Sequence, residues 1–211
     1  MMGQTELRAS PLSHWGTRFA AASHAAGHFT IRELAFTTQI NLRGDPSEDA
    51  FVNEVAGAIG LALPLEPNTY TGSDLRTAIW LGPDEWLITA PDGEHQSLPA
   101  ALREALNGQH HSVVDQSANR TLIEIAGSEA RLVLAKGCTL DLHASAFSAP
   151  RCAQTLLAKA PVILQGMAAN AFGLYVRDSF AEYLAEWLVD AAAECAAARA
   201  LDTDRVAARL G

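Results

Sequence analysis

The sequence predicts an α+β fold of two lobes that share one core, each with the element order strand, helix, strand, strand, helix. The order occurs twice along 211 residues, 49% of the residues are apolar, and no low-complexity linker separates the two occurrences. An apolar share of this size can fill a core, and the missing linker favours lobes that pack together. The halves share no residue-level identity, so the repeat is inferred from element order alone.

This order divides the chain into four parts. We expect an N-terminal arm at 1–27, a first lobe at 28–109, a second lobe at 110–198 and a C-terminal tail at 199–211.

The first lobe is predicted to begin with a half-buried strand. Apolar and polar residues alternate from Phe36 to Leu42, which is the period of a strand with one buried face. A helix should follow, with Asp45 as its N-cap, Glu48 three residues later and Gly60 at its end.

Two strands and a helix complete the first lobe. The apolar runs 77–81 and 86–90 flank the turn-forming residues 82–85, which predicts a hairpin. A second helix should begin at Ser97 and end near Gly108.

The second lobe is predicted to repeat this order. We expect strands within 112–126, a helix at 128–136 that Gly137 stops, and an irregular stretch from Cys138 to Ala153. The remaining predicted elements are strands at Thr155–Gln165 and Phe172–Arg177 and a long helix from Ser179 to about Ala198.

The last helix carries two signals. Ser179 and Glu182 fit a capping box, in which both side chains satisfy free backbone donors of the first turn. An acidic row at spacing four follows on one face, made of Glu182, Glu186, Asp190 and Glu194. This row is either a solvated face, which is the commoner case, or a surface that meets basic residues of a partner.

Charge and targeting signals exclude several classes. The net charge of −9 disfavours nucleic acid and anionic membrane surfaces as partners. No apolar run approaches the roughly 20 residues that span a bilayer, and the N-terminus does not resemble a signal peptide. Three widely spaced cysteines, Cys138, Cys152 and Cys195, favour a reducing cytoplasm over a disulfide framework.

Reactive chemistry is sparse in this sequence. Neither the GxGxxG nor the GxxxxGK[ST] phosphate loop occurs, and HExxH and GxSxG are also absent. Cys138, Asp141 and His143 lack the convergent spacing of a metal site, so an ordinary polar loop is expected. A nucleophilic Cys138 or Cys152 would need a nearby histidine, and a buried, inert cysteine is the commoner case. We therefore assign no catalytic, cofactor-binding or metal-ligating residue.

Two groups remain as candidates for binding. A polar cluster of Asp115, Ser117, Asn119 and Arg120 lies between two apolar runs and should serve as a turn. The alternative is that Asp115 and Arg120 bind a pterin or a carboxylate.

A tryptophan pair, Trp80 and Trp86, flanks the predicted hairpin turn. At least one should lie in the core, and the other, if exposed, is a candidate anchor for a partner.

Several strings resemble the gamma subunit of heterotetrameric sarcosine oxidase. WLGPDEWLI and RCAQTLLAKAPVIL, at 80–88 and 151–164, are the more specific ones. The others are INLRGDPSEDAF (40–51), VVDQSANRTLIEIAG (113–127), LAKGCTLDLHASAF (134–147) and RDSFAEYLAEWL (177–188). Together they cover most of residues 40–190.

The resemblance implies a cytoplasmic complex of four different chains that oxidatively demethylates sarcosine to glycine, with tetrahydrofolate as the one-carbon acceptor. It implies that FAD, FMN, NAD and tetrahydrofolate belong to other chains, and that this chain is non-catalytic. Its partners would be the alpha subunit first, and also the beta and delta subunits. The fold implied is that of folate-dependent aminomethyltransferases.

One segment departs from those aminomethyltransferases. They carry a Tyr-Thr-Gly-Glu motif before a Gly-Phe-Glu strand, whereas this chain reads GMAANAFGLYVR and has Leu174 in place of the strand's glutamate. We therefore carry over no folate-binding residue, and predict a scaffold that has lost its site. The alternative is a stand-alone folate- or pterin-binding module.

Overall fold

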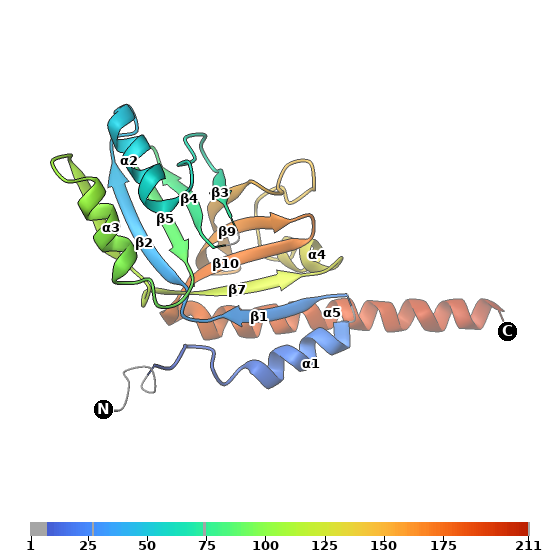
Figure 1. Ribbon diagram of the computed structural model, residues 1–211. Coiled ribbons are helices and arrows are strands. Elements are labelled where there is room, and N and C mark those ends of the chain that lie inside the picture. The colour runs from blue at the N-terminus through green and yellow to red at the C-terminus, as the bar shows by residue number, and fades with distance from the viewer. Residues whose placement is uncertain (1–7, 27, 74, 211) are drawn as a thin grey trace.

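The protein is described by a computed structural model, which covers residues 8–26, 28–73 and 75–210, with side chains up to Cys195 except those of His24 and Ala26. It contains two five-stranded antiparallel sheets with helices on their outer faces (Figure 1). The strands are β1 Thr30–Leu34, β2 Thr38–Gly44, β3 Tyr70–Gly72, β4 Thr77–Gly82, β5 Glu85–Ala90, β6 His111–Asp115, β7 Arg120–Ala126, β8 Cys152–Leu157, β9 Ala160–Ala168 and β10 Ala171–Arg177. The helices are α1 Gly16–Ala26, α2 Asp49–Ile59, α3 Ser97–Ala105, α4 Ala130–Ala135 and α5 Asp178–Leu210. The predicted α+β class with two lobes around a shared core is confirmed. The predicted order within each lobe is wrong, because each half after α1 runs strand, strand, helix, three strands and helix instead of strand, helix, strand, strand, helix.

The two sheets have the same topology, because corresponding strands of the two halves take corresponding places in them. One has the order β3-β4-β5-β2-β6, and the other, taken from its far edge, has the order β8-β9-β10-β7-β1. Each half therefore gives its first strand to the edge of the other half's sheet. The predicted lobe boundary at 109/110 falls between α3 and β6, but β6 pairs with β2 and β1 pairs with β7.

Three apolar layers hold the fold together. One lies between the first sheet and its helices α2 and α3, and a second lies between the other sheet and α1, α4 and α5. The third lies between the sheets and is formed by Ile79, Leu87, Leu122, Cys152, Ile163 and Tyr175. This inter-sheet layer explains why no linker was found, because the two halves have one continuous interior.

The first predicted strand needs two corrections. It begins at Thr38, because Phe36 adopts a positive φ of 60° in the turn before it. It is also buried on both faces, since Gln39 and Asn41 are buried as well as Ile40 and Leu42. Gln39 donates to the carbonyl of Arg120 at 2.7 Å, and Asn41 donates to the Glu85 carboxylate at 2.7 Å. The polar face therefore hydrogen-bonds within the protein instead of meeting water.

The start of the first predicted helix is also wrong. Asp45 Oδ1 accepts hydrogen bonds from the backbone N–H of Ser47 at 2.9 Å and from its hydroxyl at 2.7 Å. These bonds close a turn, lower the pKa of Asp45, and delay the helix until Asp49. Its end is as predicted, with Gly60 in the left-handed conformation.

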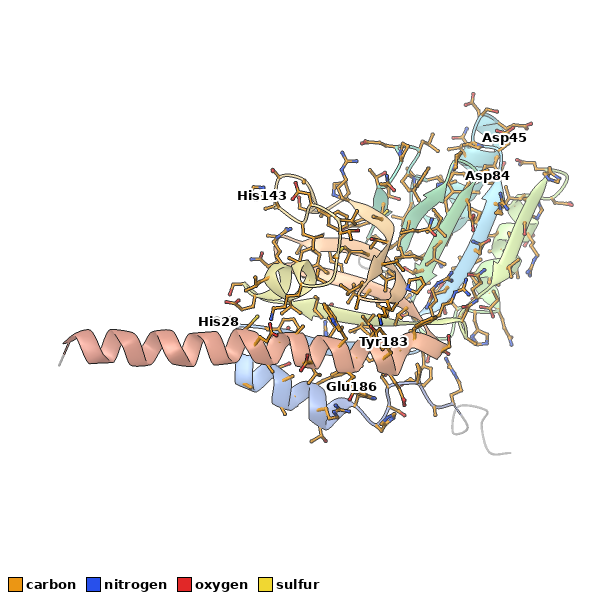
Figure 2. All side chains as sticks on the ribbon, turned by 180° about the vertical axis from the view of Figure 1, so that it is seen from behind. His28, Asp45, Asp84, His143, Tyr183 and Glu186 are labelled. Carbon is orange, nitrogen blue, oxygen red and sulfur yellow. The ribbon has the colours of Figure 1, made fainter. Side chains whose placement is uncertain are left out.

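The N-terminal segment holds an element that the sequence did not reveal. Within the predicted arm, α1 packs along α5 and β1 (Figure 2). Phe19 on α1 is buried in the core, and so is Trp15, the residue directly before the helix. Residues 1–7 and 27 of that arm lie outside the described residues.

The predicted strand 155–165 is a hairpin rather than one strand. The chain reverses at Ala158, which adopts a φ of 53° without the help of glycine. The sequence there contains no glycine or asparagine signal for such a turn.

The predicted capping residue Ser179 lies inside the helix, whereas α4 ends at Ala135, close to the predicted stop at Gly137. Helix α5 begins at Asp178, directly after β10, and Glu182 pairs with His14 at 3.2 Å. A side chain at Gly137 would collide with the Trp187 ring, so this glycine permits close packing of α4 against α5. Helix α5 also continues past the predicted end near Ala198 and projects beyond the body (Figure 1).

Candidate functional site: a polar hollow and the surface around it

The predicted polar cluster forms the turn that carries the chain from one sheet to the other. Asp115 Oδ1 accepts from the backbone N–H of Ser117 at 2.9 Å and from its hydroxyl at 2.6 Å. The backbone N–H of Asn119 donates to the carbonyl of Gln116 at 2.9 Å. The turn role predicted for this cluster is confirmed.

Buried Gln39 fixes this turn to the first sheet. Its backbone N–H donates to the Ser117 hydroxyl at 3.0 Å, and its side-chain amide donates to the carbonyl of Arg120 at 2.7 Å. These two hydrogen bonds hold the turn at both ends. Loss of either one would leave a buried polar group without a partner, which is costly.

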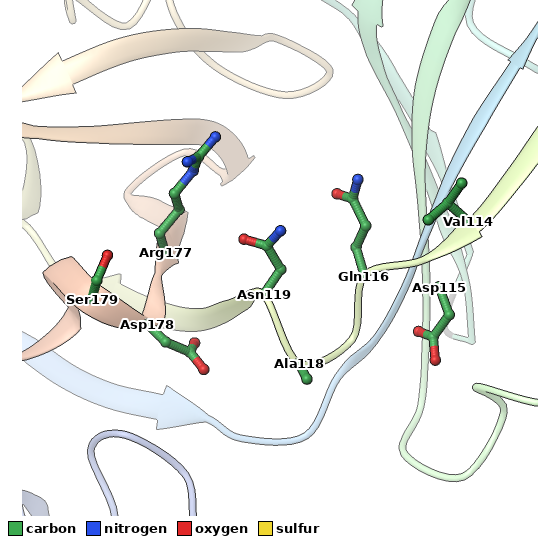
Figure 3. A pocket seen from close by; sticks show the side chains of 8 residues that line it. All are labelled: Val114, Asp115, Gln116, Ala118, Asn119, Arg177, Asp178 and Ser179. Carbon is green, nitrogen blue, oxygen red and sulfur yellow. The ribbon is translucent and has the colours of Figure 1, made fainter.

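Two hollows adjoin this turn, and Asp115, Ala118 and Asp178 line both of them. The first has a volume of about 590 Å³ and is lined by Val114, Asp115, Gln116, Ala118, Asn119, Arg177, Asp178 and Ser179 (Figure 3). The second, of about 680 Å³, extends to the N-terminal segment and includes Arg8, Phe36, Asp92, His95 and Arg120 in its lining.

The polar and charged side chains around the first hollow point to two different sides of the turn. In Figure 3 the side chains of Arg177, Gln116 and Asn119 project to one side of the turn, and the carboxylates of Asp115 and Asp178 project to the other. Burial and the nearby Glu33 carboxylate raise the pKa of Asp178. The hollow therefore offers cationic and amide donors on one side of the turn.

Of the two cysteines considered as nucleophiles, Cys138 is half-buried and Cys152 is buried. Cys152 is buried between the sheets, where its thiol donates to the carbonyl of Thr69 at 3.2 Å. Burial raises the pKa of this thiol to about 12. Cys195 is buried in α5, where its thiol lies 3.8 Å from the carbonyl of Ala191.

We expect Cys152 to resist alkylation in the native protein at pH 8, because its thiol is protonated and inaccessible. Iodoacetamide treatment followed by mass spectrometry should leave Cys152 unmodified, while half-buried Cys138 serves as an internal comparison. Unfolding in urea should make all three cysteines reactive. Rapid native labelling of Cys152 would contradict its placement between the sheets.

Asp141 and His143, which were considered as metal ligands, lie in a surface loop. Asp141 Oδ1 accepts from the backbone N–H of His143 at 2.9 Å, and the His143 ring pairs with the Ser145 hydroxyl at 2.7 Å. Over the residues that the structure describes, no three His, Cys, Asp or Glu side chains gather where a metal could bind.

The two candidate tryptophans lie opposite each other on neighbouring strands. Trp86 is fully buried, and its indole N–H donates to the carbonyl of Pro64 at 2.8 Å. It therefore has no surface to offer a partner, in line with the expectation that one of the pair is core. Trp80 is half-buried against the same core and keeps an exposed part.

The acidic row on α5 meets basic residues of the same chain. Glu182 pairs with His14, Glu186 with Arg18 of α1 at 3.5 Å, and Glu194 with Lys136 at 2.8 Å. Figure 2 shows Glu186 on the side of α5 that faces α1. Three of the four interface candidates in this row thus have partners within the protein, and Asp190 is exposed.

Large apolar side chains also remain at the surface. Those most exposed among the described residues are Leu65, Leu75, Val114, Leu132, Leu156, Phe180 and Tyr183. Val114 lines the first hollow, and Phe180 directly follows Ser179, which lines it too. No helix in the described part of the chain has the length and apolarity needed to cross a bilayer.

The arrangement of the two sheets resembles that of solved proteins. The glycine cleavage system aminomethyltransferase T from Bartonella henselae superposes with a TM-score of 0.58 at 16% identity, over 82% of this chain and 48% of that one. A chain of the heterotetrameric sarcosine oxidase from Corynebacterium sp. U-96, in complex with pyrrole 2-carboxylate, superposes with a TM-score of 0.82 at 35% identity, over 90% of this chain and 97% of that one. The protein therefore has the aminomethyltransferase-like fold.

Sequence comparison narrows this class. The sarcosine oxidase subunits gamma of Corynebacterium sp. strain P-1 and of an Arthrobacter species are each 39% identical over 93% of this chain and 95% of their own length. Residues 43–194 match the model of the sarcosine oxidase gamma subunit family. The chain belongs to the sarcosine oxidase gamma subunit family.

Proposed function

We propose that this chain is a non-catalytic structural subunit of a heterotetrameric sarcosine oxidase. The observation that carries the proposal is the end-to-end superposition with one chain of such a complex, which covers 97% of that chain. The complex would oxidatively demethylate sarcosine to glycine, and tetrahydrofolate would accept the one-carbon unit.

The chemistry of this chain supports the structural part of the proposal. The polar groups of the turn already hydrogen-bond to Gln39 of the first sheet, and the buried Cys152 thiol is protonated. Tyr175 lies between the sheets, and burial raises its pKa to about 12, so it also remains protonated at neutral pH. We expect FAD, FMN, NAD and tetrahydrofolate to bind to the other chains.

The partners would be the other sarcosine oxidase subunits. We infer the alpha subunit as the main contact and the beta and delta subunits as further members of the assembly. Free cysteines at all three positions are compatible with a reducing compartment, and we place the complex in the cytoplasm.

Reconstitution tests this proposal. The four chains are co-expressed with an affinity tag on this one, and we expect the other three to co-purify and to oxidise sarcosine. Omission of this chain should lower the yield of assembled complex, and this chain purified by itself should show no sarcosine oxidation. Failure of the tagged chain to retain any other subunit would refute the proposal.

The second candidate, a stand-alone folate- or pterin-binding module, is favoured by the aminomethyltransferase-like fold and by the hollow beside Asp115 and Arg120. It requires saturable binding of tetrahydrofolate to this chain alone. Calorimetry with millimolar tetrahydrofolate separates the two candidates, and we expect no heat of binding.

A further inference from the structure

Arg177, at the end of β10, differs from the other arginines of this protein. Of the arginines whose side chains the structure describes, it alone has a guanidinium that makes no hydrogen bond and no ion pair with another residue. In a chain of net charge −9, most arginines find a carboxylate, so an exposed guanidinium without one is unusual.

A second guanidinium lies directly opposite. Arg177 and Arg120 are cross-strand partners in the β10–β7 ladder, and Arg120 donates to the Gln116 side chain at 2.7 Å rather than to a carboxylate. Burial and the charge of Arg177 both lower the pKa of Arg120, and the charge of the Glu85 carboxylate opposes them in part. Like charges opposite each other destabilise a sheet, so the folded chain alone gains nothing from this pair.

Neighbouring amides add donors to the same side of the hollow. Gln116 uses its side-chain oxygen to accept from Arg120, which leaves its NH₂ group free to donate. Asn119 projects beside it, and both amides point to the same side as Arg177 (Figure 3). This side of the hollow is thus rich in donors, while the two lining carboxylates, Asp115 and Asp178, project to the other side of the turn.

Apolar surface adjoins these donors. Val114, which is 46% exposed, lines the hollow, and the next residue after the lining Ser179 is Phe180, which is 36% exposed. Tyr183, 40% exposed, follows one turn later on α5. Arginine and tyrosine are enriched at the energetic centres of interfaces.

We propose that this hollow, with Val114 and Phe180 at its side, is the docking surface for another subunit of the oxidase complex, which presents a carboxylate flanked by apolar side chains to Arg177. The inference rests on the proposed function and names the surface that serves it. Charge complementarity identifies the occupant, because a carboxylate between Arg177 and the amides would offset the repulsion between the two arginines.

Charge reversal tests this surface in the assembled complex. The tagged chain carrying Arg177→Glu is titrated against the co-purified other subunits, and we expect the dissociation constant to rise at least tenfold. Arg177→Lys, which keeps the positive charge, should stay within about threefold of the unmodified chain. Arg43→Glu is the control, since the Arg43 side chain is also exposed, lies at the end of β2 away from the Ser117 turn, and pairs with Asp84.

A stability measurement separates lost docking from lost folding. A glutamate at position 177 would face Arg120, so the melting temperature of the Arg177→Glu chain should equal or exceed that of the unmodified chain. Weaker assembly with undiminished stability supports the proposal. Unchanged affinity of Arg177→Glu, or equal weakening by Arg43→Glu, overturns it. If the unmodified chain fails to bind the other subunits, the proposed function itself fails.

Discussion

The Trp86→Ala chain should lose about 3–5 kcal/mol of its free energy of unfolding, which is the usual cost of removing a fully buried large aromatic side chain. Trp86 has no exposed surface, and its ring centroid lies 5.9 Å from that of Phe51 on α2. Its indole N–H satisfies the carbonyl of Pro64 at 2.8 Å, so truncation also leaves that carbonyl without its donor. Urea denaturation followed by circular dichroism measures the effect.

Two variants separate the contributions of Trp86. Trp86→Phe keeps most of the packing but removes the hydrogen bond to Pro64, and should cost about 1–3 kcal/mol. Trp80→Ala, which truncates the half-buried partner on β4, should cost less than Trp86→Ala. An unfolding midpoint of Trp86→Ala equal to that of the unmodified chain would show that this side chain is not packed as described.

Arg131→Ala is expected to lower the free energy of unfolding by about 3 kcal/mol, since hydrogen bonds from charged groups contribute roughly 1.5–3 kcal/mol each and are not additive. The guanidinium of Arg131 on α4 donates to the carbonyls of Leu142, Phe147 and Ala169. It also lies 4.9 Å from the centroid of the Phe172 ring. One side chain thus ties α4 to the irregular loop and to the β9–β10 turn.

We expect lysine at this position to restore only part of the stability that Arg131 provides. A single ammonium group cannot reach three carbonyls as a planar guanidinium does, so Arg131→Lys should recover less than half of the loss. Arg43→Ala, which removes one exposed ion pair, should change stability by less than about 1 kcal/mol. An Arg131→Ala chain as stable as Arg43→Ala in urea would contradict the role assigned to Arg131.

Local signals in the sequence located the elements that depend on neighbouring residues. The β4–β5 hairpin, the start of α3 at Ser97 and the end of α2 at Gly60 all follow from turn chemistry and apolar period. The reversal at Ala158 and the turn at Phe36 could not be predicted in this way. Both residues hold a positive φ without glycine, which only the packing around them enforces.

The candidate site was only partly visible in the sequence. The turn at Asp115 was predicted because its side-chain bonds are local, and the core position of one tryptophan was expected. The partners of the acidic row on α5 were not, because Arg18 lies far away in the sequence within an arm that showed no pattern. Arg177 was not singled out at all, since nothing local distinguishes an unpaired arginine from a paired one.

By itself, the sequence determined the α+β class, the presence of two similarly ordered halves and the family, since these depend on local turn chemistry, apolar period and matching strings of residues. Only the tertiary structure decided that each half gives its first strand to the other's sheet, and that Arg120 and Arg177 therefore lie side by side. The physical reason is that strand pairing is a long-range choice. It is set by which apolar faces bury each other, and residues distant in sequence carry no local mark of the neighbour they will meet.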